Sequence, residues 1–173
     1  EHYVKDGALG ASFKLNYRDE KADGRTDRII TAHSPAYTSS LLIQTYTSPT
    51  RQFSVNAEVH HARWLTKKWM MQAQYTFQAD RNRTDQDFLT DGQTDMANSY
   101  SDHYGNQTHS LKFGSTINLE PIQLMPSLTA KWQRESQDYQ RGMLDTAAVC
   151  HSFLVDPSLR ATWKLSKTVG FEL

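Results

Sequence analysis

The side chains best suited to chemistry in the middle of this sequence are histidines and a carboxylate. Glu58 and His60 lie two residues apart, a spacing that puts both on one face of a strand, whereas His61 points to the other face. A zinc site needs a third protein ligand, and the sequence shows none near this pair. We therefore interpret Glu58 and His60 as polar residues of a sheet face, and we predict no metal and no cofactor.

A second group of polar residues follows Ala79, in a stretch that we expect to form a long loop up to Gln107. Calcium is held by several carboxylates that converge on one point. The spacing differs from that of an EF-hand loop, because Gly92 follows Asp91 without the acids that should precede it. We expect a solvated or ligand-contacting loop whose tyrosines could stack on a sugar or another ligand. Its candidate ligand-contacting residues are Asp85, Asp87, Asp91, Asp95, Tyr100 and Tyr104.

No nucleophile motif accompanies these residues. The single cysteine, Cys150, excludes a disulfide framework, and a lone thiol on a strand is more often incidental than nucleophilic. The sequence has no G-x-S-x-G elbow, no G-x-x-x-x-G-K-[ST] phosphate loop and no G-x-G-x-x-G fingerprint. We therefore predict that the chain is not an enzyme.

Composition excludes two further classes. The 173 residues include 19 Lys+Arg and 19 Asp+Glu, so there is no net positive field to attract nucleic acid. Mean hydropathy is -0.69, and no apolar run approaches the roughly 20 residues of a membrane helix. A membrane β-barrel is not excluded, because only half of the residues in each of its strands face lipid.

The elements that carry these residues are strands, because apolar side chains recur with a period of two. From Leu9 to Tyr17 every odd position is apolar, and most of the even positions between them are polar. Similar alternation starts at Phe53, Trp69, Leu111, Leu128 and Leu159. No segment shows a helical period of 3.6, so the fold class is all-β: an antiparallel meander with one apolar face.

Strand length and connections favour a transmembrane outer-membrane barrel. Several segments alternate for about 10 to 12 residues, and roughly 11 residues tilted near 45° span about 25 Å, the height of an outer-membrane apolar band. The connections after Leu65 and Leu165 are short, whereas the one after Ala79 is long. Outer-membrane barrels have short periplasmic turns and long extracellular loops. The polar face then lines a wet lumen, and the apolar face contacts lipid.

Taking the short turns as periplasmic gives a provisional threading. Upward strands are expected at 8–19, 38–47, 69–80, 127–137 and 169–173. Downward strands are expected at 27–33, 51–65, 107–119 and 149–165. The connections are a loop at 20–26, a turn at Ser34-Pro35, the long loop, a turn at 120–126 and a loop around Gly142. Pro157 interrupts a predicted strand, and we expect a bulge there.

Aromatic residues are placed as two membrane-interface belts would require. Trp64, Trp69 and Trp163 flank the short turns. Tyr17, Tyr75 and Phe77 lie nearer the loop ends, where a second belt is expected.

Three segments also resemble a known family. These are "WLTKKWMMQAQYTFQAD", "PSLTAKWQRES" and "DPSLRATWKLSKTVGFEL", which resemble strands of large outer-membrane proteins from Bacteroides-type bacteria and are similar to TonB-dependent receptors with a C-terminal β-barrel. The resemblance implies energised nutrient uptake across the bacterial outer membrane. The implied partners are membrane lipid, the remaining strands and plug of the barrel, TonB, and a small-molecule or oligomeric nutrient. Residues 1–173 would then be one segment of a longer barrel, with about eight to nine strands.

Two alternatives stay open. A soluble all-β binding or adhesion domain, as a sandwich or small barrel, would pack its apolar residues inside, whereas a barrel wall would place them on a common outer surface. The residues that separate the two are Phe13, Val55, Tyr75, Phe113 and Trp163. A non-transport barrel enzyme or assembly protein would need a catalytic constellation near one rim, and the sequence contains none.

Overall fold

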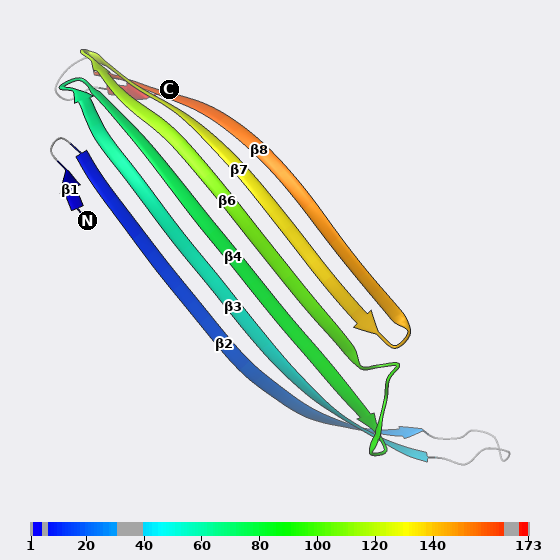
Figure 1. Cartoon of the computed structure of the whole chain (residues 1–173). Coiled ribbons are helices and arrows are strands. Elements are labelled where there is room, and N and C mark those ends of the chain that lie inside the picture. The colour runs from blue at the N-terminus through cyan, green and yellow to red at the C-terminus, as the bar shows by residue number, and fades with distance from the viewer. Residues whose placement is uncertain (1, 5–6, 31–39, 165–169, 173) are drawn as a thin grey trace.

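The chain forms one antiparallel sheet (Figure 1). The computed structural model describes residues 2–4, 7–30, 40–164 and 170–172. Strands are ordered β1-β2-β3-β4-β6-β7-β8-β9, with β5 paired to β4, so the predicted all-β antiparallel meander is confirmed. The strands are β1 His2–Val4, β2 Gly7–Ile30, β3 Ser40–Thr66, β4 Trp69–Thr90, β5 Gln93–Thr94, β6 Tyr100–Leu119, β7 Ile122–Arg141, β8 Leu144–Lys164 and β9 Gly170–Glu172. Within these described residues no helix is long and apolar enough to cross a membrane.

The long strands extend beyond the predicted ones, and β2 is twice as long as predicted. β2 contains 24 residues and β3 contains 27, and the two are paired along almost their whole length. The predicted loop 20–26 is therefore part of β2, and the predicted break between 47 and 51 is part of β3. Segments 27–30 and 40–47 run in the directions opposite to those predicted for them. The predicted turn at Ser34-Pro35 lies outside the described residues.

The predicted long loop is also mostly strand. β4 continues to Thr90 and β6 begins at Tyr100, which leaves only residues 91–99 as the connection. At the other end of the sheet the predicted turn 120–126 shrinks to Glu120 and Pro121. The sequence concealed the first of these extensions because its residues are polar on both faces, and alternation is visible only where the faces differ.

Register sorts the side chains onto two faces, because cross-strand partners lie on the same side of a sheet. One row of partners consists of Phe13, Ala57, Phe77, His109, Trp132 and Phe153. The adjacent row, on the opposite face, consists of Lys14, Asn56, Gln78, Thr108, Gln133 and Ser152. We call these two sides of the sheet the apolar face and the polar face.

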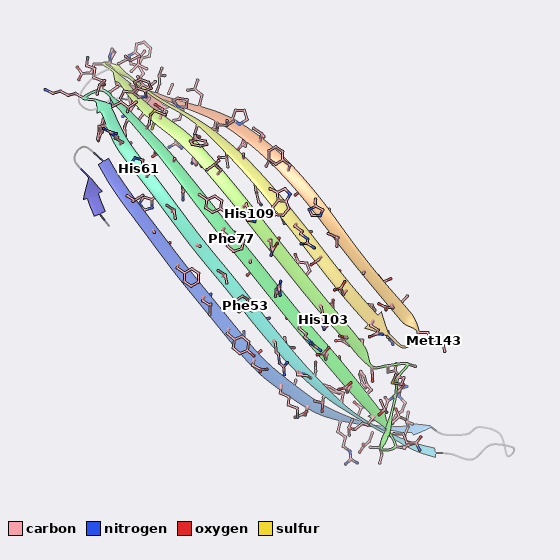
Figure 2. All side chains as sticks on the ribbon, viewed as in Figure 1. Phe53, His61, Phe77, His103, His109 and Met143 are labelled. Atoms are coloured by element: carbon pink, nitrogen blue, oxygen red, sulfur yellow. The ribbon has the colours of Figure 1, made fainter. Side chains whose placement is uncertain are left out.

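The apolar face has no second layer among the described residues (Figure 2). None of their hydrophobic side chains is buried: Phe13 and Phe153 are each 69% exposed and Trp163 is 50% exposed. Phe13, Val55, Tyr75, Phe113 and Trp163 all lie on this one face. The packing expected of a soluble sandwich or small barrel is therefore wrong for this part of the chain, and the expected common surface is present.

Apolar residues occupy only part of the apolar face. On β7 they extend from Ile122 to Trp132, about 33 Å along the strand at roughly 3.3 Å per residue. With a tilt of about 40°, this apolar band has the roughly 25 Å height of an outer-membrane barrel. Beyond it the strands continue as a region that is mainly polar on both faces. This polar extension comprises residues 19–28, 42–52, 81–90, 100–106, 134–141 and 144–148.

Prolines account for most irregularities in the ladder. The bulge expected at Pro157 is absent, because β7 and β8 stay in register through Pro157 and its partner Leu128. Among the described residues β9 pairs with β8 only at 162–164, so no described strand needs a backbone donor from Pro157 on that side. Pairing of β3 with β4 is interrupted at Pro49, and pairing of β6 with β7 is interrupted at Pro126, as expected for a residue without an N–H.

Candidate functional site

The six predicted ligand-contacting residues do not converge. Asp85 and Asp87 lie on the apolar-face side of β4, Tyr100 and Tyr104 lie on the polar face of β6, and the other two acids lie in the connection. No group of three or more His, Cys, Asp or Glu side chains suited to a metal ion occurs within the described part of the chain. Ligand contact by the whole set stays a prediction that the geometry does not favour.

Asp95 and Asp91 organise the connection between β4 and β6. Asn98 Nδ2 donates to the Asp95 carboxylate at 2.7 Å and Thr90 Oγ1 donates to it at 3.0 Å. The bond from Asn98, followed by that from Thr90, lowers the pKa of Asp95 despite some desolvation. Asp91, at a φ of 52°, exchanges two hydrogen bonds with the backbone of Ile43: its N–H donates at 2.9 Å and its Oδ1 accepts at 3.1 Å. These acids shape the connection and attach it to β3.

Asp85 is the centre of a cluster in the polar extension. Arg83 Nε donates to its carboxylate at 2.7 Å, Ser101 Oγ donates to it at 2.6 Å, and His103 Nε2 lies 3.5 Å away. Burial alone would raise the pKa of Asp85, but the bonds from Ser101, Arg83 and His103 outweigh burial and lower it. Asp85 is thus held as a carboxylate that neutralises Arg83.

The two predicted tyrosines belong to the polar face. Tyr100 stacks on Tyr139 of β7, with ring centroids 6.1 Å apart and an interplanar angle of 27°. Tyr104 is 39% exposed, two rows nearer the apolar band. On the same face Glu58 and His60 lie 3.6 Å apart, as the spacing of two predicted. The polar face therefore carries both aromatic and titratable side chains.

The apolar band ends, on the side of the polar extension, at a row of rings that we call the aromatic row: Phe77, His109 and Trp132. His109 lies beside Phe77, with ring centroids 4.9 Å apart (Figure 2). On its other side the ring centroid of Trp132 is 5.2 Å away. Tyr75 Oη lies 2.7 Å from His109 Nδ1, so the imidazole has a polar partner on an otherwise apolar surface. Sequence reasoning did not single out His109, because a lone histidine in a strand gives no signal until register places it among rings.

The predicted interface aromatics divide between the faces. Trp69 and Trp163 lie on the apolar face near the short turns, and Tyr17, Tyr75 and Phe77 lie on the same face farther along. Trp64 is opposite Met70, on the polar face, so its predicted grouping with Trp69 and Trp163 is wrong. The physical reason is the alternation itself, because Trp64 is an even position of β3 and the apolar face takes the odd positions that start at Phe53.

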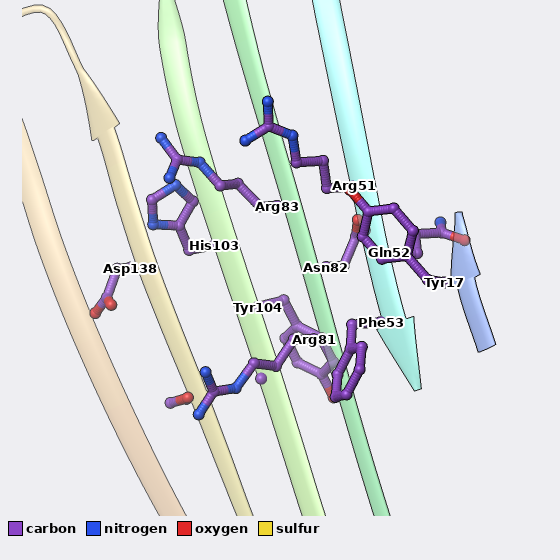
Figure 3. A pocket seen from close by; sticks show the side chains of 12 residues that line it. Tyr17, Arg51, Gln52, Phe53, Arg81, Asn82, Arg83, His103, Tyr104 and Asp138 are labelled. Atoms are coloured by element: carbon purple, nitrogen blue, oxygen red, sulfur yellow. The ribbon is translucent and has the colours of Figure 1, made fainter. Parts of the chain in front are cut away.

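A hollow on the apolar face, just beyond the aromatic row, brings together arginines that the sequence did not group (Figure 3). It comprises a cavity of about 420 Å³, lined partly by Arg51, Arg81 and Arg83, and one of about 100 Å³, lined partly by Arg81 and Arg134. These residues come from three strands, and only the register shows that they are neighbours. We call this pair of cavities the rim hollow.

Comparisons with known proteins identify solved structures with a similar fold but do not assign a family. No family model and no curated protein matches the sequence. Solved structures do match, among them the ferric yersiniabactin uptake receptor FyuA from Yersinia pestis and the ferric citrate transporter FecA. FyuA has 14% identity and a TM-score of 0.51 over 95% of this chain and 24% of its own. FecA has 10% identity and a TM-score of 0.51 over 96% of this chain and 26% of its own.

At these identities the likeness concerns the fold alone. The chain spans about a quarter of the length of both structures. It has the fold of a segment of an outer-membrane β-barrel wall, as the alternation, the single layer and the apolar band indicate.

Proposed function

We propose that the chain is part of the wall of a TonB-dependent receptor-like transporter, which takes up a nutrient across the bacterial outer membrane. The observation that carries the proposal is the single-layer sheet with a 25 Å-scale apolar band on one face and a polar face on the other. Such a sheet is stable only if lipid covers the band, because exposed apolar patches of this extent are rare in soluble proteins.

Further strands are required partners of this wall. β1 and β9 are paired on one side only within the described residues, and both are very short. A membrane sheet must close, because lipid offers no hydrogen-bond partner to an open edge. The described strands do not pair β1 with β9, so this wall needs further strands to close.

Transport is supported by two weaker arguments. The solved structures with this fold include proteins named as an uptake receptor and as a transporter. The polar face would line the interior, where wide outer-membrane barrels hold either a channel or a plugged lumen. Under this proposal Tyr100, Tyr104 and the Glu58–His60 pair face the interior, where a plug or a nutrient would contact them.

Accessibility of single cysteines tests the wall in the intact protein. After Cys150→Ser, Phe153→Cys should react with a membrane-partitioning maleimide and resist a charged one in native membranes. The adjacent Ser152→Cys is the matched control and should react with the charged reagent once it reaches the interior. Equal reaction of both cysteines with the charged reagent would contradict lipid contact at the apolar face.

Uptake needs its own test. Cells with and without the protein would be compared for uptake of a panel of labelled metal chelates and oligosaccharides, each with and without a protonophore. The proposal expects at least one compound whose uptake requires both the protein and the energised membrane. Protein-dependent uptake that persists with the protonophore would instead indicate a passive channel with the same wall.

A further inference from the structure

Charges on the apolar face are layered by distance from the aromatic row. The first row beyond it is Leu15, Val55, Ala79, Gln107, Arg134 and His151. The second is Tyr17, Phe53, Arg81, Gly105, Ser136 and Val149. Acids enter only in the third, which is Asp19, Arg51, Arg83, His103, Asp138 and Ala147. A layer with arginines and no acid therefore separates the apolar band from the ion-paired extension.

The arginines of this layer differ from those above it. In the third row Arg51 lies 3.7 Å from Asp19, and Arg83 lies 2.7 Å from Asp85. Arg81 and Arg134 have no carboxylate within 4.0 Å among the described residues, and neither donates a side-chain hydrogen bond there. Two guanidinium groups near an apolar surface thus keep their donors available for a ligand.

The rim hollow gives these two arginines a shared site. Arg81 and Arg134 lie on β4 and β7 with β6 between them and in adjacent rows, so two strand spacings and one row put their Cα atoms about 12 Å apart. Gly105 keeps the space between the two arginines open because it has no side chain. A Cβ at this position would lie 2.9 Å from Ser136 Oγ. Figure 3 shows the Arg81 side chain extending across β6 toward β7. Gln107 and Ser136 add polar groups to the lining of the same cavity, which Asp80 also lines from a row of the polar face.

We propose that Arg81 and Arg134 bind the phosphate of a phosphorylated lipid headgroup in the membrane leaflet next to the polar extension. A guanidinium presents its donors in a planar fork that matches phosphate oxygens, and such charge-assisted bonds are stronger than neutral ones. The acyl chains of the same lipid would lie against the apolar band below. The inference rests on the barrel-wall part of the proposed function and is independent of transport.

A headgroup fits this layer better than a soluble anion does. The site lies directly beyond the row of Phe77, His109 and Trp132, where rings mark a membrane interface. A lipid contributes the apolar contact as well as the phosphate, whereas a free anion contributes only the charge. One row farther on, Asp138 and Asp19 would repel an anion, which confines the phosphate to the two acid-free rows.

Native mass spectrometry of the intact protein in detergent tests this inference. The probes are a diphosphorylated lipid A, the same lipid without phosphates, and inorganic phosphate. The unmodified protein should retain the phosphorylated lipid and bind the other two about tenfold more weakly or worse. Equal retention of the dephosphorylated lipid, or equally tight binding of inorganic phosphate alone, would overturn the headgroup site without affecting the proposed transport function.

Matched variants locate the site. R81Q/R134Q should weaken binding of the phosphorylated lipid by about tenfold or more, and R81K/R134K should weaken it less. K14Q/K131Q removes the same charge from the polar face and should leave binding unchanged. If both glutamine pairs weaken binding equally, the effect is one of net charge and the site is refuted. If R81Q/R134Q does not fold, the comparison of the three probes on unmodified protein decides.

Discussion

Arg51 of β3 and Arg83 of β4 occupy directly opposite positions on the sheet, and each is neutralised by a different carboxylate. Arg83 donates to Asp85 at 2.7 Å, and Arg51 lies 3.7 Å from Asp19. Like charges opposite each other destabilise an antiparallel pair. The polar extension therefore depends on flanking acids to keep β3 and β4 paired beyond the apolar band.

The first prediction concerns the pH dependence of this extension. The pKa of Asp85 is lowered in the folded protein, so its contribution to stability is present above its unfolded pKa of about 3.9 and is lost as pH falls through the lower folded value. The thermal midpoint of the intact protein should therefore fall as pH decreases from about 5 to below 4. In Asp85→Asn that fall should be smaller, and Asp87→Asn, a neighbour on the same strand face, is the control. An identical pH profile for Asp85→Asn would contradict the cluster.

A second prediction uses depth within the apolar band. Phe113→Arg, which lies well inside the band on β6, should cost about 2 to 4 kcal/mol of unfolding free energy in lipid vesicles. Gln107→Arg, at the rim of the band, should cost about 0 to 1 kcal/mol, and Ser110→Arg, on the polar face, should be near neutral. Denaturant titration of the intact protein measures all three. Equal costs for Phe113→Arg and Ser110→Arg would show that the two faces do not meet different solvents.

The third prediction concerns the connection of residues 91–99. Asp95 accepts bonds from Asn98 and Thr90, so Asp95→Ala should loosen the connection without disturbing the barrel. Limited proteolysis of intact cells should then cut between β4 and β6 several-fold faster than in the unmodified protein. Asp87→Ala removes an acid that forms no salt bridge among the described residues, and it should leave the cleavage rate unchanged. Unaltered cleavage of Asp95→Ala would mean that backbone bonds alone hold the connection.

A fourth prediction concerns the contact between a glycine and a histidine ring on the polar face. Gly10 lies opposite His60, and a Cβ at Gly10 would overlap the imidazole. Gly10→Ala should therefore displace the ring and destabilise the β2–β3 pair by about 1 kcal/mol. In the double variant Gly10→Ala/His60→Ala the two effects should be less than additive, because the overlap is gone. Strict additivity of the unfolding free energies would refute the contact.

The fold class followed from the sequence because the period-two pattern is local. Residues 9–17 alternate wherever the strand is placed, so one face had to be apolar and the chain had to be all-β. The same reasoning failed in residues 20–26, 81–90 and 100–106, where both faces are mainly polar and a strand looks like a loop. Pairing over the whole length of β2, β3, β4 and β6 decided those strands, since backbone hydrogen bonding does not depend on side-chain polarity.

The candidate sites show the same division. Spacing alone put Glu58 and His60 on one face, and the structure agrees. No local signal could show that the rim hollow joins Arg81 to Arg134, because they lie on strands separated by β6 and only register brings them into adjacent rows of one face. Trp64 faces away from Trp69 because it is an even position of β3, which follows from the alternation that starts at Phe53 and not from tertiary pairing. The sequence by itself determined which residues alternate, and tertiary pairing decided which of them meet.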